Sequence, residues 1–352
     1  MLELNNTVGK IFIIFIESNF HFYKDNVIGG GLLQNRSNVL IELAANYVEE
    51  LNIDVGYAGV GGSVGRGEAD EYSDLDLIVY TNTSVPKNNL DVLYNGEIIQ
   101  LDILDIAKIP NEQEILEFPW DYRFLSEMSI IKDNDGLLSD IIKSATNYFN
   151  SYDGKKKLLE QVSNIVRERI EFANKCLDEN RLYSANIASM GAWAEAGFLY
   201  LFVNYNLLST GGLIPVLEKL NNHIERFKNV SPFSMEGELS DVSLILSSFR
   251  QHLRDQGHLY NDLSEVHDTL CDRKIKRLLI NKERLNLLWQ IYGEAVGLYF
   301  ETSNGLSLEK YFQDLPISLQ NGLSKIGFIP LNKNKVNELS NLSKELLAFC
   351  YC

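Results

Sequence analysis

The chain has 352 residues, of which 45% are hydrophobic, and it can therefore bury one full core and more readily two. Its formal net charge of -16 disfavours any partner held by its phosphates, because polyanion binding depends on clustered lysine and arginine. We therefore expect no nucleic-acid partner, whereas a cationic small molecule suits this charge.

The start of the chain carries one apolar run, KIFIIFIE at residues 10–17. It is too short to span a bilayer and is followed by no small-residue cleavage site, so we expect a strand or a buried helical turn and no membrane partner. The four cysteines form no CxxC pair, which indicates a reducing, cytoplasmic environment. Residues 36–51 repeat apolar side chains at helical spacing and predict an amphipathic helix.

Several strands are predicted after this helix. DVGYAGV at residues 54–60 is typical of a short buried strand, and SDLDLIVY at 73–80 alternates polar and apolar residues. EIIQLDILDI at 97–106 predicts a third strand, and residues 120–136 predict a helix, a strand and a turn. Helix and strand are thus mixed up to about residue 150.

From Lys155 onward the apolar residues follow a period of 3.6 in long segments separated by short breaks. The predicted helices are residues 155–178, 182–208, 212–228, 240–256 and 274–300, which together indicate a helical bundle. Turn residues cluster at 150–156. We therefore expect an α+β chain, with a catalytic domain at 1–150 and an all-α substrate-binding domain at 151–352. The tail after residue 302 is expected to be partly helical.

The segment GYAGVGGSVGRGEADEYSDLDLIVY, residues 56–80, places a glycine-rich loop before an Asp-Leu-Asp strand. Asp74 and Asp76 are two residues apart in that strand, so they project to the same face, about 6 to 7 Å apart. Two carboxylates beside many backbone N–H groups suit Mg²⁺ and the phosphates that it bridges. Ser63 adds a hydroxyl and Arg66 a guanidinium fork. These residues predict a nucleoside triphosphate site.

Two common nucleotide-binding motifs are absent from the loop. It contains neither the GxxxxGK[ST] of a Walker A motif nor a GxGxxG fingerprint. A polar surface turn followed by a solvated acidic strand end is the alternative, and an isolated Asp-x-Asp would favour it. The succession of strand, Gly-Gly-Ser, arginine and Asp-Leu-Asp strand is more specific than any one of these parts.

Residues 61–77, GGSVGRGEADEYSDLDL, resemble the signature of the DNA polymerase β-like nucleotidyltransferase superfamily, a Gly-Ser pair followed by an hDhDh strand. They are most similar to the minimal and antibiotic-modifying members, such as the kanamycin nucleotidyltransferases. The resemblance implies a polymerase β-like catalytic domain with a mixed sheet. It also implies that Asp74 and Asp76 bind divalent metals, that Gly62 and Ser63 cradle the triphosphate, and that Arg66 contacts phosphate.

Many members of this superfamily take a third carboxylate from a later strand, and Asp102 is our candidate for that metal ligand. An acid between Leu101 and Ile103 in an apolar strand is costly unless it faces a metal or a partner. Asp105 points to the opposite face by parity and is expected at the end of the strand. A surface-facing edge position is the alternative for Asp102.

A second group of charged residues occurs within residues 166–176, where Glu168, Glu171 and Lys175 lie on one side of the predicted helix. Spacing alone favours a solvated face with a Glu171–Lys175 ion pair. The segment and the small-residue-rich helix after it also resemble the C-terminal bundle of the kanamycin nucleotidyltransferases. This implies that Glu171 is the general base, that Lys175 contacts nucleotide phosphates, that Glu168 helps to hold a cationic substrate, and that the enzyme forms a homodimer.

Glu195 lies in the most apolar helix of the chain, where an unpaired charge would be costly. It either forms a structural ion pair with Arg169 or is a substrate-site acid with a raised pKa. We favour the ion pair.

These features predict a Mg²⁺-dependent nucleotidyltransferase that moves a nucleoside monophosphate from ATP, or another NTP, to an acceptor hydroxyl and releases pyrophosphate. The expected acceptor is a small cationic molecule such as an aminoglycoside, which would make the enzyme an antibiotic-resistance factor. Two alternatives stay open. One is an antitoxin-like transferase that adenylylates a protein, and the other is a nucleotide-sensing module without turnover.

Overall fold

The computed structural model describes residues 30–85 and 89–350, so the apolar run at residues 10–17 lies outside the described residues. The described residues form two compact units. The first comprises residues up to 161 together with 264–273, and the second comprises 162–263 and the residues from 274 onward. A five-stranded sheet lies in the first unit and the second is helical, which confirms the predicted α+β class.

The sheet of the first unit is mixed and has the strand order β3-β4-β2-β1-β5. Its strands are β1 (Val55–Val60), β2 (Leu75–Thr81), β3 (Asn89–Tyr94), β4 (Glu97–Asp105) and β5 (Ser129–Asp133). Strands β2 and β4 are parallel, and the other neighbouring pairs are antiparallel. Strand β3 is the one that the sequence pattern did not predict.

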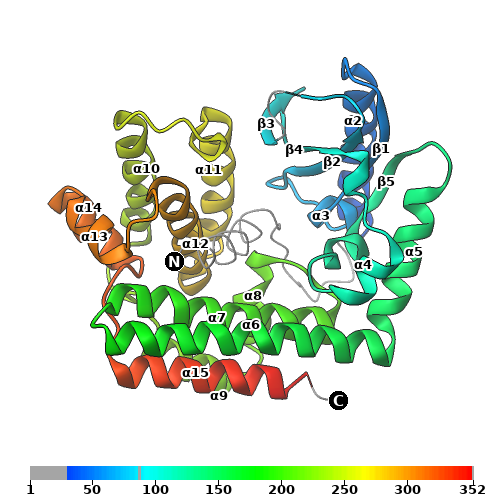
Figure 1. Ribbon diagram of the computed structural model, residues 1–352. Helices are drawn as coiled ribbons and strands as arrows, with labels where there is room; N and C mark the ends of the chain where they lie inside the picture. Colours follow the sequence, from blue (N-terminus) through cyan, green and yellow to red (C-terminus); the bar gives the residue numbers. More distant parts are fainter. Residues whose placement is uncertain (1–29, 86–88, 351–352) are drawn as a thin grey trace. The chain divides into compact units, whose positions relative to one another are not determined.

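Helix α2 (Gly30–Glu50) covers one face of this sheet (Figure 1). Its buried residues are spaced by four and pack against alternate residues of the strands. The packed residues are Leu40, Ala44 and Val48 of α2, Leu75, Leu77 and Val79 of β2, and Ile99, Leu101 and Ile103 of β4. Because side chains alternate along a strand, Asp76 and Asp102 project from the face opposite α2.

The remaining elements between residues 61 and 150 are short except for the last. They are α3 (Gly62–Gly65), η1 (Ile106–Lys108), α4 (Glu112–Glu117), η2 (Arg123–Glu127) and α5 (Leu137–Asn150). Asn111 and Glu114 form a reciprocal capping box at the start of α4, which explains why that helix begins there. Residues 120–136 form a helical turn, a strand and a turn, as predicted.

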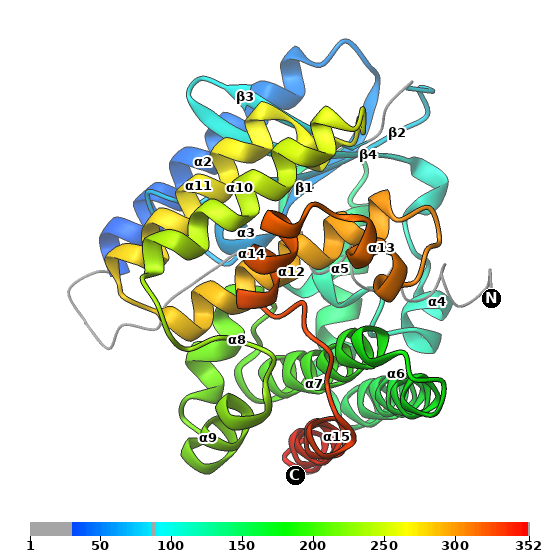
Figure 2. The ribbon, with the colours of Figure 1, turned by 90° about the vertical axis from the view of Figure 1, so that its left-hand side faces the viewer.

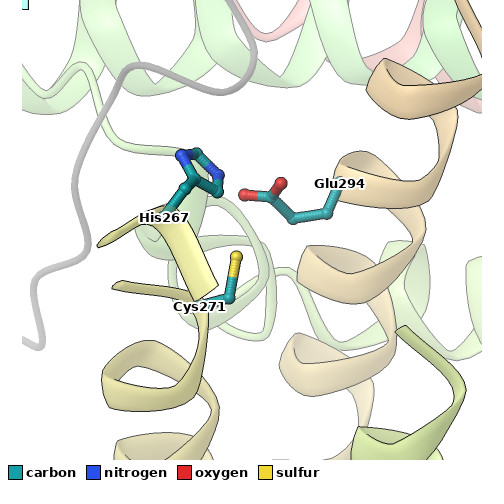
Figure 3. Close-up of side chains that lie close together, drawn as sticks. All are labelled: His267, Cys271 and Glu294. Atoms are coloured by element: carbon teal, nitrogen blue, oxygen red, sulfur yellow. The ribbon is translucent and has the colours of Figure 1, made fainter. Parts of the chain in front are cut away.

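The first unit also contains the beginning of α11 (Glu265–Ile280), which lies far along the chain. His267 Nδ1 is 2.7 Å from Asp91 Oδ2 of β3, and both side chains are buried. Arg273 donates from Nη2 to the carbonyl oxygen of Gly96 at 3.0 Å, in the turn between β3 and β4. His267 and Cys271 lie one turn apart and project from the same side of the helix (Figure 3). The contacts of His267 with Asp91 and of Arg273 with Gly96 fix the start of α11 against the β3–β4 hairpin.

The helical unit begins within α6 (Tyr152–Asp178) and, apart from residues 264–273, continues to the end of the described chain. Its other helices are α7 (Leu182–Tyr205), α8 (Thr210–Leu217), α9 (Asn221–Val230), α10 (Leu239–Asp255), η3 (Asn261–Leu263), α12 (Arg284–Thr302), α13 (Leu308–Asp314), α14 (Ile317–Lys325) and α15 (Lys333–Ala348). Two predicted helices are wrong as continuous segments. Residues 212–228 divide between α8 and α9, and residues 274–300 divide between α11 and α12.

Helix α7 packs against α15 and lies beside α6 (Figure 2). Its residues are buried without interruption from 185 to 202, as its apolar composition predicts. The predicted pair between Arg169 of α6 and Glu195 of α7 is confirmed, with 3.1 Å between Arg169 Nη2 and Glu195 Oε1. In the part of the chain that the structure describes, no helix combines the length and apolar character needed to cross a bilayer.

Candidate active site

The glycine-rich segment between β1 and β2 folds into the short helix α3, not into an extended loop. It begins beside the aspartate strand, because the Gly61 N–H donates to the carbonyl oxygen of Asp76 at 2.9 Å. Gly62 has a φ of 59°, a left-handed conformation that glycine adopts without strain. A Cβ on Gly65 would overlap the backbone oxygens of Glu127 and Val60, so only glycine fits there. Two of the glycines are thus required by the backbone of the turn.

Ser63 lies in this turn and is fully buried. Among the described residues, its Oγ has no hydrogen-bond partner. A buried hydroxyl without a partner is costly, so the site favours an acceptor that arrives with a ligand. A phosphate oxygen is such an acceptor, which fits the predicted role of Ser63.

Two of the predicted metal ligands, Asp76 and Asp102, project from one face of the sheet. Asp76 of β2 is in register with Gln100 of β4, and Asp102 is in register with Ile78, so the two aspartates are diagonal neighbours on parallel strands. Strand spacing puts their Cα atoms about 8 Å apart, within reach of one shared ion. Asp74 lies immediately before β2 and is almost fully buried. Carboxylate oxygens of this kind suit a hard divalent cation.

The surroundings of Asp102 confirm that its carboxylate lies on this face. Asn89 of β3 donates from Nδ2 to Asp102 Oδ1 at 2.8 Å. Tyr80 of β2 has the same parity as Asp76, and its pKa is raised to about 12 by burial and then by the charge of Asp102. The phenol therefore stays protonated at neutral pH and can donate a hydrogen bond on this face of the sheet.

Arg66, predicted to contact phosphate, is held by two carboxylates. Its Nη1 is 2.5 Å from Glu127 Oε2, and its Nε is 2.8 Å from Glu68 Oε2. Burial lowers the pKa of Arg66, but the charges of Glu127 and Glu68 outweigh that effect and raise it. The guanidinium therefore stays positively charged, on the residue that caps the end of α3. Its contact with phosphate stays a prediction.

Glu127 was not identified from the sequence. It is buried at the end of η2, 61 residues after its partner. An acid beside the apolar residues Leu125 and Met128 was the one available signal, and nothing in the sequence connected it with Arg66.

The predicted acceptor-side residues lie in the helical unit. Glu168, Glu171 and Lys175 are exposed on α6, as a solvated face requires. Lys175 Nζ lies 4.0 Å from Glu179 Oε1. These residues and the carboxylates of the sheet belong to different compact units, and the catalytic roles of all three stay predictions.

Comparison with known proteins places the sheet in a family. The family model "Nucleotidyltransferase domain" matches residues 41–149, a region that runs from within α2 through α5 and contains every sheet strand described above. Among curated proteins, none gave a significant match.

One solved structure similar to this chain is a nucleotidyltransferase-like protein from Exiguobacterium sibiricum 255-15. The identity is 12% and the TM-score 0.31, over 84% of this chain and 88% of that protein.

The matched region contains the α3 turn, Asp74, Asp76 and Asp102, but not Glu168, Glu171 or Lys175. Domains of this family use a nucleoside triphosphate and a divalent metal ion. Residues 41–149 therefore form a nucleotidyltransferase domain, and the chain is a nucleotidyltransferase.

Proposed function

We propose that this enzyme transfers a nucleoside monophosphate from an Mg²⁺-bound NTP to a hydroxyl group of a small cationic acceptor such as an aminoglycoside. The proposed nucleotide donor is ATP, so the transferred group is AMP. The observation that carries the proposal is one arrangement of the sheet unit. The buried Ser63 hydroxyl lies in a turn whose first N–H is bonded to Asp76, and Asp76 and Asp102 project from one face of parallel strands.

Each group of that arrangement has a defined task. Asp74, Asp76 and Asp102 supply the oxygen ligands for Mg²⁺, which neutralises charge on the phosphates when it is bound. Ser63 donates to a phosphate oxygen, and Gly62 lets the backbone approach it. Arg66 adds positive charge, which favours the charge that develops on the departing pyrophosphate.

The acceptor half rests on resemblance and on charge. Glu171 would take the proton of the acceptor hydroxyl, Lys175 would contact nucleotide phosphate, and Glu168 would hold a cationic group. The formal net charge of -16 supports a cationic acceptor, because opposite charge raises its local concentration. In this proposal residues 1–150 are the catalytic domain, residues 151–352 bind the acceptor, and the enzyme acts in the cytoplasm as a homodimer.

The test is a panel of aminoglycosides and other hydroxylated antibiotics, incubated with each NTP and Mg²⁺ and followed by pyrophosphate release and product mass. We expect release that depends on one acceptor class, with a product heavier by one nucleotide residue. A labelled protein in place of a labelled small molecule would identify a protein-modifying transferase. Tight nucleotide binding without release for any acceptor would indicate a sensing role and contradict the proposal.

A further inference from the structure

The two carboxylates that bind Arg66 differ in burial. The side chain of Glu127 is 5% exposed and that of Arg66 is 8% exposed, so their ion pair is shielded from water. Glu68 is 37% exposed, so its bond to the same guanidinium is open to solvent and salt. A shielded, hydrogen-bonded pair is costly to break, whereas an exposed pair contributes little and exchanges readily.

Glu127 is part of a wider attachment between the α3 turn and the start of β5. The backbone oxygen of Glu127 lies so close to Gly65 that no Cβ fits between them. Ser129 donates from Oγ to the carbonyl oxygen of Gly65 at 3.0 Å. Together with the Arg66–Glu127 ion pair, these contacts bind both the backbone and the charged side chain of the turn to one short segment.

Glu68 has no part in this attachment. It lies just beyond the turn, and its carboxylate accepts a hydrogen bond from the Nε edge of the Arg66 guanidinium. That edge is one that a phosphate oxygen can use in the same way as a carboxylate oxygen. A triphosphate carries more negative charge than one carboxylate and also reaches Ser63, so it competes well for this position.

We infer that Glu127 is a positioning residue that fixes Arg66 and the α3 turn, and that Glu68 is a built-in competitor which a phosphate of the bound nucleotide displaces from Arg66. This deepens the proposed function and rests on it for the identity of the ligand. Nucleotide binding would then exchange one partner of Arg66 and leave the other in place.

Two substitutions with the same change in charge should act in opposite directions. Glu68→Gln removes the competitor, and we expect the Kd for Mg–nucleotide to fall several-fold. Glu127→Gln releases Arg66 and the turn from their anchor, and we expect that Kd to rise about tenfold or more. A general electrostatic effect predicts tighter binding for both variants, since each removes one negative charge near an anion site.

The experiment measures equilibrium binding of a Mg²⁺-bound ATP analogue with a methylene bridge between its α and β phosphorus atoms, which cannot be cleaved there. The full-length wild type is compared with Glu68→Gln, Glu127→Gln and Glu127→Asp. Glu71→Gln, an exposed position in the same segment, is the matched control and should change the Kd less than twofold. Glu127→Asp keeps the charge and should recover part of the lost affinity.

Shifts of both Gln variants in the same direction, or an unchanged Kd for either, would overturn the inference while the proposed function stands. A wild type that binds no nucleotide would refute the proposed function itself. If Glu127→Gln does not fold, the Glu68→Gln and Glu127→Asp variants decide, and an unchanged Kd in both overturns the inference.

Discussion

Substitution of Glu195 by glutamine should destabilise the helical unit strongly, although it changes one functional group and almost no volume. Arg169 is 6% exposed and Glu195 is 2% exposed, so the ion pair between them lies in the core. At the observed 3.1 Å between Nη2 and Oε1, the Coulomb attraction is about 5 kcal/mol at an effective dielectric constant of about 20. The amide of glutamine keeps the shape but removes the negative charge of Glu195 from the buried guanidinium.

Loss of one partner from a buried ion pair costs about 3 to 5 kcal/mol in measured cases, which agrees with that attraction. For a unit of this size, each kcal/mol lowers the melting temperature by roughly 2 to 4 °C. We therefore expect the calorimetric transition of the helical unit to fall by roughly 10 °C in Glu195→Gln. Glu171→Gln, on the exposed face of α6, removes the same charge and should shift it by less than about 2 °C.

A double variant separates the charge from the packing. Replacing Arg169 by methionine and Glu195 by leucine removes both charges at similar volume, and it should recover most of the lost stability. A melting temperature of Glu195→Gln within about 2 °C of the wild type would refute the reasoning, because the pair would then contribute no more than a surface ion pair.

Three further predictions concern the turn and the helical core. Gly65→Ala should destabilise the sheet unit by about 2 kcal/mol or more in urea unfolding, because the added Cβ meets backbone oxygens. A Cβ at Gly61 meets open space, so the control Gly61→Ala should change stability by less than about 0.5 kcal/mol. Ser63→Ala removes a costly buried hydroxyl, so it should not lower the melting temperature, but it should weaken nucleotide binding about tenfold, the loss expected for one hydrogen bond to a charged phosphate; equal binding would contradict the assigned role. Burial lowers the pKa of His223, against the opposing effect of Glu345, so the folded state keeps this ring neutral. Stability should therefore be complete above the unfolded-state pKa of 6.5 and fall as the pH decreases toward the lower folded-state pKa. Urea unfolding at about pH 7.5 and about pH 5.5 should show this loss in the wild type and a smaller one in His223→Gln, and equal losses would exclude His223 as the cause.

The alternation of polar and apolar residues along the strands was enough to predict on which face of the catalytic sheet the aspartates lie. Asp76 alternates with leucines that pack under α2, so parity alone put its carboxylate on the opposite face. The same parity argument applied to Asp102 once β4 was predicted. The buried pair of Arg169 and Glu195 was predictable because each charge interrupts an apolar helix face and the other offers the nearest opposite charge.

Features that depend on distant residues were not predictable in this way. Glu127 reaches Arg66 across 61 positions, and His267 reaches Asp91 across 176, so neither pair leaves a periodic signal. The predicted helix at 274–300 was wrong because its break occurs at Lys282, which has a φ of 57° without being glycine or asparagine. Strand β3 was missed because its six residues, NLDVLY, include an asparagine and an aspartate, two residue types that are depleted in strands.

The most direct test of the central claim is pyrophosphate release by Asp76→Asn, measured beside the wild type with saturating NTP, acceptor and a range of Mg²⁺ concentrations. Asp105→Asn is the matched control, because Asp105 lies at the end of β4 and asparagine can keep its bond to the Ala107 N–H. The account predicts Mg²⁺-dependent release in the wild type and in Asp105→Asn, and a loss of at least about a hundredfold in Asp76→Asn. Equal release by Asp76→Asn would contradict the account, because the metal-binding face of the sheet would then have no part in the reaction.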